Sequence, residues 1–269
     1  MVNDFLKMED FFLTSNKYQT PVKSKLTFCD WLKLDSRIYF TLKYIRVLIT
    51  SRKQALRKIY NRDAWVKSSF YIFRFIEKAG GRFDISGMDN ITKHNGPVVF
   101  IGNHMSTLET MILPCIIAWH RKVSFVVKES LVKHPLFKEI MLSNNPIVVG
   151  RSDPRKDLET VMNGGQERLS KGRSIIIFPQ STRRHDFVPE EFNSLGVKLA
   201  KKNNVPVVPV ALKTDYWGNG KIIKELGPID HKKTISIKFG EPFMITGSGK
   251  EEHNKVINFI QSSLSEWKD

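Results

Sequence analysis

Six short runs of β-branched and other apolar residues, separated by polar stretches, dominate the chain after Arg82. The runs cover residues 97–101, 123–127, 146–149, 174–178, 205–211 and 235–239, and most lack strict polar–apolar alternation. Such runs are typical of strands that are covered on both faces. Stretches 136–142, 157–171 and 191–202 lie between them and have helical composition. The pattern predicts an α/β fold with a mostly parallel sheet flanked by helices on both sides.

Residues 1–83 have a different texture, so we predict a helical segment there and an α/β domain over residues 84–269. Between Thr41 and Arg62 there are seven basic residues and no acidic one, with apolar residues between them at spacings of three and four. That spacing predicts a basic amphipathic helix. A second helix is predicted over residues 64–78, which end before Gly80-Gly81.

The second helix is rich in aromatic residues: Trp65, Phe70, Tyr71, Phe73 and Phe75. Amphipathic rings of this kind suit the headgroup boundary of a membrane. An alternative interpretation is a helical hairpin that packs these rings on the main domain and leaves its basic residues in water. The two interpretations are compatible with each other.

The chain carries 43 Lys and Arg against 27 Asp and Glu, a formal net charge of +16. Such an excess indicates an anionic partner: nucleic acid, an acidic lipid surface or a phosphorylated small molecule. Because the basic residues alternate with apolar helix positions and no nucleic-acid module is recognisable, we expect an anionic membrane surface and no nucleic acid.

We expect this contact to be peripheral and on the cytoplasmic face. The best candidate for a spanning helix, residues 38–50, is interrupted by Lys43 and Arg46, and a span needs roughly 18 or more apolar residues. The first residues also lack the basic start and apolar run of a secretory signal. The two cysteines, Cys29 and Cys115, form no CxxC pair, so a disulfide framework or a metal site is not expected.

Polar residues follow the first predicted strand, where reactive groups gather in open α/β sheets. His104 comes just after it, and Glu109 stands five positions later. On an uninterrupted helix the two side chains would diverge by roughly 140°. The chain must therefore turn at Met105-Ser106, with Ser106 or Thr107 as the helix N-cap. This arrangement suits a general base and its orienting carboxylate. The alternative is that His104 caps the helix and Glu109 favours its N-terminal dipole.

Two further strand ends carry polar residues. Arg151 follows Val149-Gly150, and Gln180, Ser181, Thr182 and Arg183 follow Phe178-Pro179. An Arg at a strand end binds phosphate well, and small hydroxyl residues with free N–H groups suit a phosphate or an oxyanion. A salt bridge at Arg151 and an ordinary turn at 180–183 are the alternatives.

Taken together, these segments resemble the glycerolipid acyltransferase family, which includes 1-acylglycerol-3-phosphate and glycerol-3-phosphate acyltransferases. Residues 103–109 resemble the family's NHxxxxD block, 149–151 its Arg-containing block, 178–183 its FPEGTR block and 205–210 its VPIVPV block. The four blocks occur in the family's order, and the resemblance covers roughly residues 82–245.

The resemblance implies an acyltransferase that moves a fatty acyl group from acyl-CoA or acyl carrier protein to a glycerolipid hydroxyl. The expected acceptor is 1-acylglycerol-3-phosphate (lysophosphatidic acid), and the product is phosphatidic acid for phospholipid biosynthesis. His104 would be the base and Glu109 its orienting residue. Arg151 and Arg183 would bind the acceptor phosphate, Lys128 would be a further ligand, and backbone N–H groups near Ser181-Thr182 would stabilise the oxyanion. No metal and no cofactor beyond the acyl donor are expected.

The chain departs from the family at two places in these blocks. Glu109 stands where the family has Asp, and Gln180-Ser181 stand where it has Glu-Gly. The neutral Gln180 would alter recognition of the acceptor. This leaves as alternatives a different lysophospholipid or lipid acceptor, or a lipid-binding relative without catalytic activity.

Overall fold

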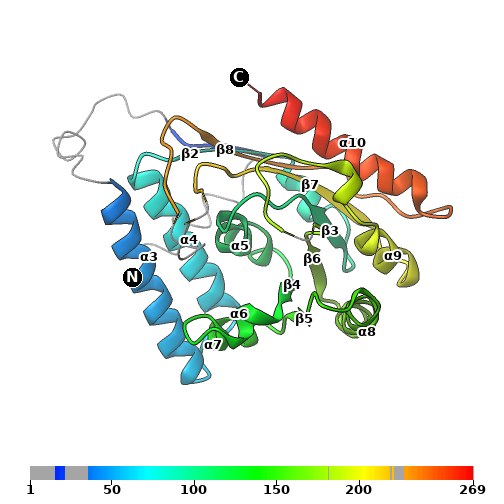
Figure 1. Cartoon of the computed structure of the whole chain (residues 1–269), viewed down its shortest axis with the longest axis horizontal. Coiled ribbons are helices and arrows are strands. Elements are labelled where there is room, and N and C mark those ends of the chain that lie inside the picture. Colours follow the sequence, from blue (N-terminus) through cyan, green and yellow to red (C-terminus); the bar gives the residue numbers. More distant parts are fainter. Residues whose placement is uncertain (1–15, 22–35, 181, 219, 221–226, 269) are drawn as a thin grey trace.

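The computed structural model describes residues 16–21, 36–180, 182–218, 220 and 227–268 (Figure 1). Within these residues, eight strands form one sheet in the order β1-β2-β8-β7-β3-β6-β4-β5. Their bounds are β1 (Lys17–Gln19), β2 (Arg82–Ser86), β3 (Val99–Gly102), β4 (Val123–Lys128), β5 (Ile147–Val149), β6 (Ser174–Ile177), β7 (Val207–Lys213) and β8 (Thr234–Phe239). Of the described pairings, β1–β2 and β7–β8 are antiparallel and the other five are parallel. The predicted mostly parallel sheet is confirmed.

Helices cover both faces of the sheet. They are α3 (Ser36–Leu56), α4 (Arg62–Lys78), α5 (Leu108–Leu113), α6 (Glu129–Lys133), α7 (Lys138–Leu142), α8 (Pro154–Ser170), α9 (Leu195–Lys202) and α10 (Lys250–Glu266). Short helices of other types are η1 (Met88–Ile91), the π-helix η2 (Pro114–Ala118) and η3 (Pro189–Glu191). Figure 1 shows α3 and α4 at one side of the molecule, with α8, α9 and α10 at the other.

Successive residues of the central strands point into different cores. In β3, Phe100 belongs to the core on the side of α3, α4 and α5, while Val99 and Ile101 belong to the core beneath α8, α9 and α10. The same alternation places Ile176 of β6 in the first core and Ile175 in the second. Both faces of the strand are thus apolar, because the two-residue period of a strand sends neighbouring side chains to opposite faces. This explains the unbroken apolar runs in the sequence.

Several elements differ from the sequence-based expectation. β1, β2 and α10 were not predicted. The helix expected over 191–202 begins only at Leu195, because Phe192 is extended and the Asn193 side chain accepts the Leu195 N–H at 3.0 Å.

Pro209 lies inside β7, between β8 and β3. A proline lacks the N–H that a central strand needs. It is tolerated here because pairing with β8 begins only at Val210, opposite Phe239. Beyond that point Gly240 donates its N–H to the Pro209 carbonyl at 2.8 Å.

The aromatic residues of α4 pack largely on the main domain. The Phe73 ring stacks on Phe83 of β2 at a centroid distance of 3.9 Å, and Trp65 meets Phe125 of β4 edge-on at 5.9 Å. Trp217, after β7, meets Phe40 and Tyr44 of α3 at 4.9 and 5.1 Å. The hairpin interpretation therefore holds for these rings. The division at residues 83 and 84 stays a prediction, because α3 and α4 share one apolar core with the sheet.

A pair of glycine substitutions separates backbone strain from close packing. Gly87 and Gly172 both have a left-handed φ, of 71° and 72°. A Cβ at Gly87 would lie 2.0 Å from the Phe239 carbonyl oxygen, whereas at Gly172 it would meet nothing within 4 Å. We expect Gly172→Ala to lower the unfolding free energy by about 1 kcal/mol and Gly87→Ala by about 3 kcal/mol or more, measured by urea unfolding. Equal losses would contradict the packing at Gly87.

Candidate active site

The candidate residues gather at one edge of the sheet. β3 lies between β6 and β7 and is parallel to both. The carboxyl ends of the three strands therefore meet at the same edge, near the middle of the sheet. The loop after β3 contains residues 103–107, the loop after β6 contains residues 178–184, and residue 214 follows β7. β4 and β5 are parallel to this group and end at the same edge with Lys128 and Val149.

Asn103 extends the pairing of β3 with β7 by one residue through its side chain. Its Nδ2 donates to the Leu212 carbonyl at 2.7 Å, and its Oδ1 accepts the Leu212 N–H at 2.9 Å. The side chain is buried, so both groups of the amide replace contacts that water would otherwise make. Asn103 thus anchors the loop that carries His104. The sequence placed Asn103 in the catalytic block without a role; an amide directly after a buried strand was the available signal.

The peptide groups of His104 are held by the loop after β6. Its N–H donates to Oε1 of Gln180 at 2.6 Å, and its carbonyl accepts the Arg184 N–H at 3.0 Å. Gln180 is buried. Its side-chain oxygen is therefore directed to the backbone of His104.

The His104 imidazole is enclosed on three sides. It stacks on Phe178 with a centroid distance of 4.7 Å and an interplanar angle of 7°. Arg183 donates its Nε–H to His104 Nε2 over a long 3.4 Å. On the other side, Nδ1 lies 3.7 Å from Oε1 of Glu109, an ion-pair separation longer than a hydrogen bond. Among the residues that the structure describes, none accepts a hydrogen bond from Nδ1.

Glu109 is completely buried in the first turn of α5. Its Oε1 accepts the N–H groups of Met105 (2.6 Å) and Ser106 (3.0 Å). Burial by itself raises the pKa of this carboxyl. The neighbouring His104 and the two N–H donors outweigh burial, so the pKa of Glu109 lies below its ordinary value. Glu109 thus satisfies N–H groups at the helix start and also faces the imidazole. Among the described residues no capping bond from His104 is seen, and the role of His104 as general base stays a prediction.

Ser106 fastens this turn to β7. Its Oγ donates to the Thr214 carbonyl at 3.0 Å and accepts the Leu108 N–H at 3.1 Å. Thr214 directly follows β7 and is fully buried. The hydroxyl of Ser106 thus makes the helix-start contact, while Thr107, at the N-cap position, makes no side-chain capping bond. Nothing in the sequence around Thr214 indicated this contact.

Arg151 stands in a left-handed conformation, with φ of 65°, which costs roughly 1–2 kcal/mol for a residue with a Cβ. Asp157 in the first turn of α8 holds it there, because its two oxygens accept the N–H groups of Gly150 (2.9 Å) and Arg151 (2.8 Å). The Arg151 residue is exposed overall. Its guanidinium group is partly buried, and this burial lowers its pKa; the nearby charge of Arg183 lowers the pKa further. The charges of the two guanidinium groups thus influence each other.

The other predicted ligands are placed differently. Lys128 ends β4 with an exposed side chain. Thr182 is exposed, Arg183 is partly buried, and Ser181 lies outside the described residues. The acceptor contact expected of Gln180 stays a prediction, since the structure directs its oxygen to His104.

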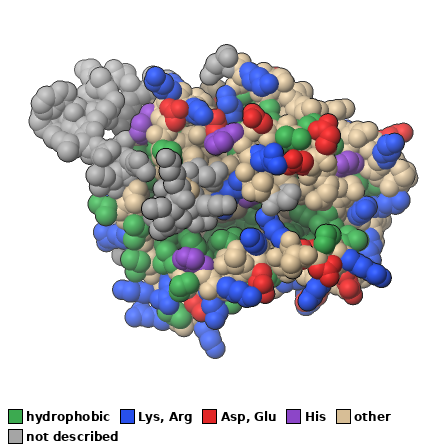
Figure 2. Space-filling view, viewed as in Figure 1, with side chains coloured by type: hydrophobic (Ala, Val, Ile, Leu, Met, Phe, Trp, Pro, Cys, Tyr) green, Lys and Arg blue, Asp and Glu red, His purple; other side chains and the backbone are tan. Residues whose placement is uncertain are grey.

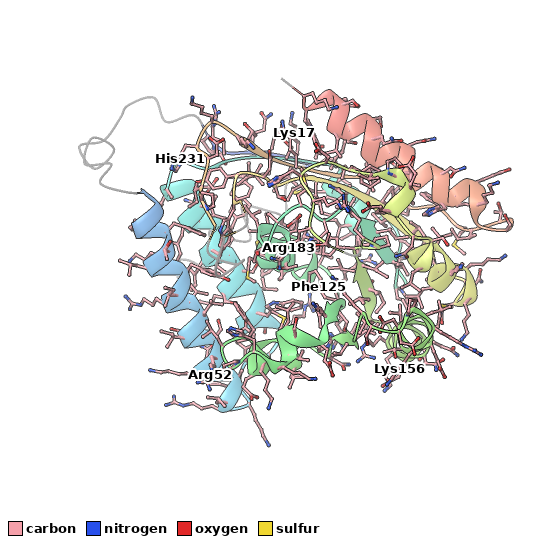
Figure 3. All side chains as sticks on the ribbon, viewed as in Figure 1. Lys17, Arg52, Phe125, Lys156, Arg183 and His231 are labelled. Carbon is pink, nitrogen blue, oxygen red and sulfur yellow. The ribbon has the colours of Figure 1, made fainter. Side chains whose placement is uncertain are left out.

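An apolar cavity of about 50 Å³ lies against Arg183 and Phe125. Its wall includes Arg183, which touches His104, and Phe125, whose ring lies 6.3 Å from that of Phe178. Figure 3 shows Arg183 and Phe125 near the middle of the molecule, close to α5 and β4. A second cavity of about 30 Å³ lies under α3 and shares Trp65, Thr110, Met111, Phe137 and Met141 with the first. Residues 215–218 are not part of either wall.

Among the residues described, no group of three or more His, Cys, Asp and Glu side chains is arranged to hold a metal ion.

Comparison with known proteins places this geometry in context. The family model described as Acyltransferase matches residues 82–213. The chain is 30% identical over 186 residues to 1-acyl-sn-glycerol-3-phosphate acyltransferase of Pseudomonas aeruginosa, covering 69% of this chain and 67% of that one. It is 28% identical over 167 residues to a chloroplastic 1-acyl-sn-glycerol-3-phosphate acyltransferase of Brassica napus, covering 62% of this chain and 45% of that one.

The fold also resembles a solved structure. The crystal structure of the 1-acyl-sn-glycerophosphate acyltransferase PlsC from Thermotoga maritima superposes with a TM-score of 0.64 at 22% sequence identity. The match covers 87% of this chain and 97% of that one. At this identity the likeness concerns the fold.

The lowered pKa of Glu109 predicts how its replacement acts on stability. Because the folded pKa lies below the ordinary value of 4.5, the ionised carboxylate stabilises the fold fully above that value, and its contribution is lost as the pH falls through the folded pKa. At pH 7, Glu109→Gln should lower the unfolding free energy by about 2 kcal/mol. The difference from wild type should shrink when urea unfolding is repeated near pH 3. A difference independent of pH would contradict an ionised Glu109.

Proposed function

The chain belongs to the glycerolipid acyltransferase family, and on that premise we propose that it acylates 1-acylglycerol-3-phosphate to form phosphatidic acid. The acyl donor is acyl-CoA or acyl carrier protein. The observation that carries the proposal is the position of His104, held between Glu109 and the loop after β6 and in contact with Arg183, which lines an apolar cavity. An acyltransferase needs a base, a carboxylate to orient it and an apolar place for the acyl chain in this arrangement.

His104 acts as the general base in this proposal. Nε2 removes the proton from the acceptor hydroxyl while the hydroxyl oxygen attacks the thioester carbon. A C–O bond forms and the C–S bond breaks, and the proton passes from His104 to the leaving thiolate. Glu109, ionised because its pKa is lowered, offsets the charge of the imidazolium. Its 3.7 Å separation from Nδ1 would shorten to a hydrogen bond with substrates bound, as catalytic hydrogen bonds are often long in free enzymes.

Arg151 and Arg183 are the proposed ligands of the acceptor phosphate. Guanidinium groups bind phosphate through two parallel N–H donors, and the two here lie close enough to influence each other. Arg183 also touches Nε2 of His104 in the free protein. An incoming phosphate would draw Arg183 toward itself and leave the lone pair of Nε2 open to the acceptor hydroxyl.

The acyl chain is proposed to lie in the apolar cavity. A volume of about 50 Å³ holds about three to five water molecules, which is too small for a long chain. Met111 and Met141 stand between this cavity and the one beneath α3. Methionine side chains are unbranched and adapt their shape readily. Their movement would join the two cavities into one path for the chain.

His104→Ala should lower the rate of acyl transfer to 1-acylglycerol-3-phosphate by at least 10²-fold, because general base catalysis contributes about 10²–10⁴-fold. Labelled acyl-CoA and a panel of lysolipid acceptors would measure it, with circular dichroism and vesicle binding unchanged. His94→Ala, at an exposed histidine, is the matched control and should retain the wild-type rate. A His104→Ala rate near wild type would contradict the assignment, and no thioester consumption by wild type with any acceptor would favour a non-catalytic lipid-binding protein.

We propose further that α3 contacts an anionic membrane surface on its cytoplasmic face. Leu42, Ile49 and Leu56 are exposed on α3 and recur every seven residues, and the exposed bases Arg46 and Lys53 stand between them. These spacings place all five on one helix face. Figure 2 shows apolar and basic side chains together at the side of the molecule where α3 runs.

Such a face suits a helix that lies in the lipid headgroup region. The negative potential of the cytoplasmic leaflet attracts basic segments, in agreement with the net charge of +16. Among the described helices, none combines the length and hydropathy that crossing a bilayer requires.

The apolar part of this face can be tested with vesicles. Leu42 and Leu56 are 64% and 52% exposed. Replacing both with serine should weaken binding to vesicles of phosphatidylcholine and phosphatidylglycerol by roughly tenfold or more. A leucine side chain that moves from water into the lipid contributes about 1.5–3 kcal/mol to binding. Sedimentation with the vesicles measures it. Leu158→Ser on α8, at a leucine 38% exposed, should bind as wild type does. Equal effects of the two changes would argue against α3 as the contact.

A further inference from the structure

Acyl transfer places a negative charge on the acyl carbonyl oxygen in the transition state, and a donor must meet it. Backbone N–H groups beside the base are the usual donors. The family resemblance assigns this role to N–H groups near Ser181-Thr182, and Ser181 lies outside the described residues. In the loop after β3, most backbone N–H groups beside the base are already engaged within the protein. The N–H of His104 donates to Gln180, those of Met105 and Ser106 donate to Glu109, and that of Leu108 donates to Ser106 Oγ.

The polar side chains in the wall of the apolar cavity are Thr107, Thr110, Asn144 and Arg183. The Thr110 hydroxyl donates to the Thr107 carbonyl at 2.8 Å, and Asn144 Nδ2 donates to the Ile140 carbonyl at 3.0 Å. Arg183 contacts His104. Within the part of the chain that the structure describes, the hydroxyl of Thr107 makes no hydrogen bond.

The lack of a partner is costly at this position. Thr107 is only 2% exposed, and a buried hydroxyl without a hydrogen bond destabilises the fold. Ser106 Oγ has taken the capping contact with the Leu108 N–H, so capping does not explain a hydroxyl at residue 107. Thr107 lies three residues from His104 and contacts the same cavity as Arg183. A ligand in the cavity would supply the missing partner.

On the basis of the proposed function, we infer that Thr107 is a catalytic residue whose hydroxyl donates a hydrogen bond to the acyl carbonyl oxygen. When the acceptor oxygen bonds to the carbonyl carbon, the π electron pair moves to the carbonyl oxygen, which accepts the Thr107 hydrogen bond. The pair then returns, the C–S bond breaks, and the thiolate takes the proton held by His104. The hydroxyl hydrogen rotates about the Cβ–Oγ bond and can point to an acceptor in the cavity that Thr107 lines.

Thr107→Val tests the inference, because valine keeps the shape and removes only the hydroxyl. We expect kcat to fall by about 10- to 100-fold, a smaller loss than for a full oxyanion donor, with little change in KM for acyl-CoA. The Tm should stay the same or rise, because a buried hydroxyl without a partner is removed. Thr107→Ser keeps the donor and should restore most of kcat.

Ser263→Ala is the matched control. Ser263 in α10 is also fully buried, and its hydroxyl has no hydrogen-bond partner in the described structure, but it lies outside the cavity wall. Its removal should leave kcat unchanged. Wild-type kcat in Thr107→Val, or an equal loss in Thr107→Ser, would overturn the inference.

These outcomes are separable from failure of the proposed function. If the wild-type protein transfers no acyl group to any acceptor, the proposed function fails before Thr107 is tested. If it transfers and His104→Ala does not, while Thr107→Val is as active as wild type, only the role of Thr107 is rejected. A lowered kcat with a collapsed Tm would assign Thr107 to folding and would also overturn the inference.

Discussion

The peptide groups of a buried loop at the end of a central strand need hydrogen-bond partners, but no neighbouring strand supplies them. The loop after β3 meets this requirement with side chains. Asn103 pairs with the Leu212 backbone, Gln180 accepts the His104 N–H, and Glu109 accepts the next two N–H groups. Unpaired peptide groups there would cost about 1–3 kcal/mol each. The same contacts hold the backbone that carries the His104 imidazole, the proposed base.

This requirement also explains why the two departures from the family blocks are compatible with the geometry. Glu109 carries one methylene more than Asp, and from the first turn of α5 it reaches back to the N–H groups of residues 105 and 106 while staying 3.7 Å from the imidazole. Gln180 lacks the charge of Glu, but an amide oxygen accepts the His104 N–H as a carboxylate oxygen would. Both residues keep the contact that the loop needs. Recognition of the acceptor phosphate is proposed to rest on Arg151 and Arg183, whose charges influence each other.

The N-terminal helices pack on the main domain, as one interpretation of their sequence expects, and the membrane contact of the other interpretation stays a proposal. The rings of Trp65 and Phe73 on α4 pack against the sheet, and Trp217 holds α3 through Phe40 and Tyr44. The opposite face of α3 keeps Leu42, Ile49 and Leu56 exposed. A helix has room for both functions because its 3.6-residue period separates one face from the other. The second cavity lies beneath α3, so the proposed membrane contact and the proposed acyl path adjoin each other.

The sequence by itself determined the α/β class, the six apolar strands and the segments that carry His104, Arg151 and Arg183, because burial on both faces and strand-end chemistry are local properties of the chain. It also required a turn between His104 and Glu109, and α5 begins at Leu108 as that turn demands. Pairing across the sheet was decided only by the tertiary structure. The contacts of Asn103 with Leu212, of Ser106 with Thr214 and of His104 with Gln180 join residues 76 to 109 positions apart. No local pattern encodes such partners, because they depend on which strands become neighbours. In the same way, only the tertiary structure shows that the buried hydroxyl of Thr107 has no hydrogen-bond partner among the described residues.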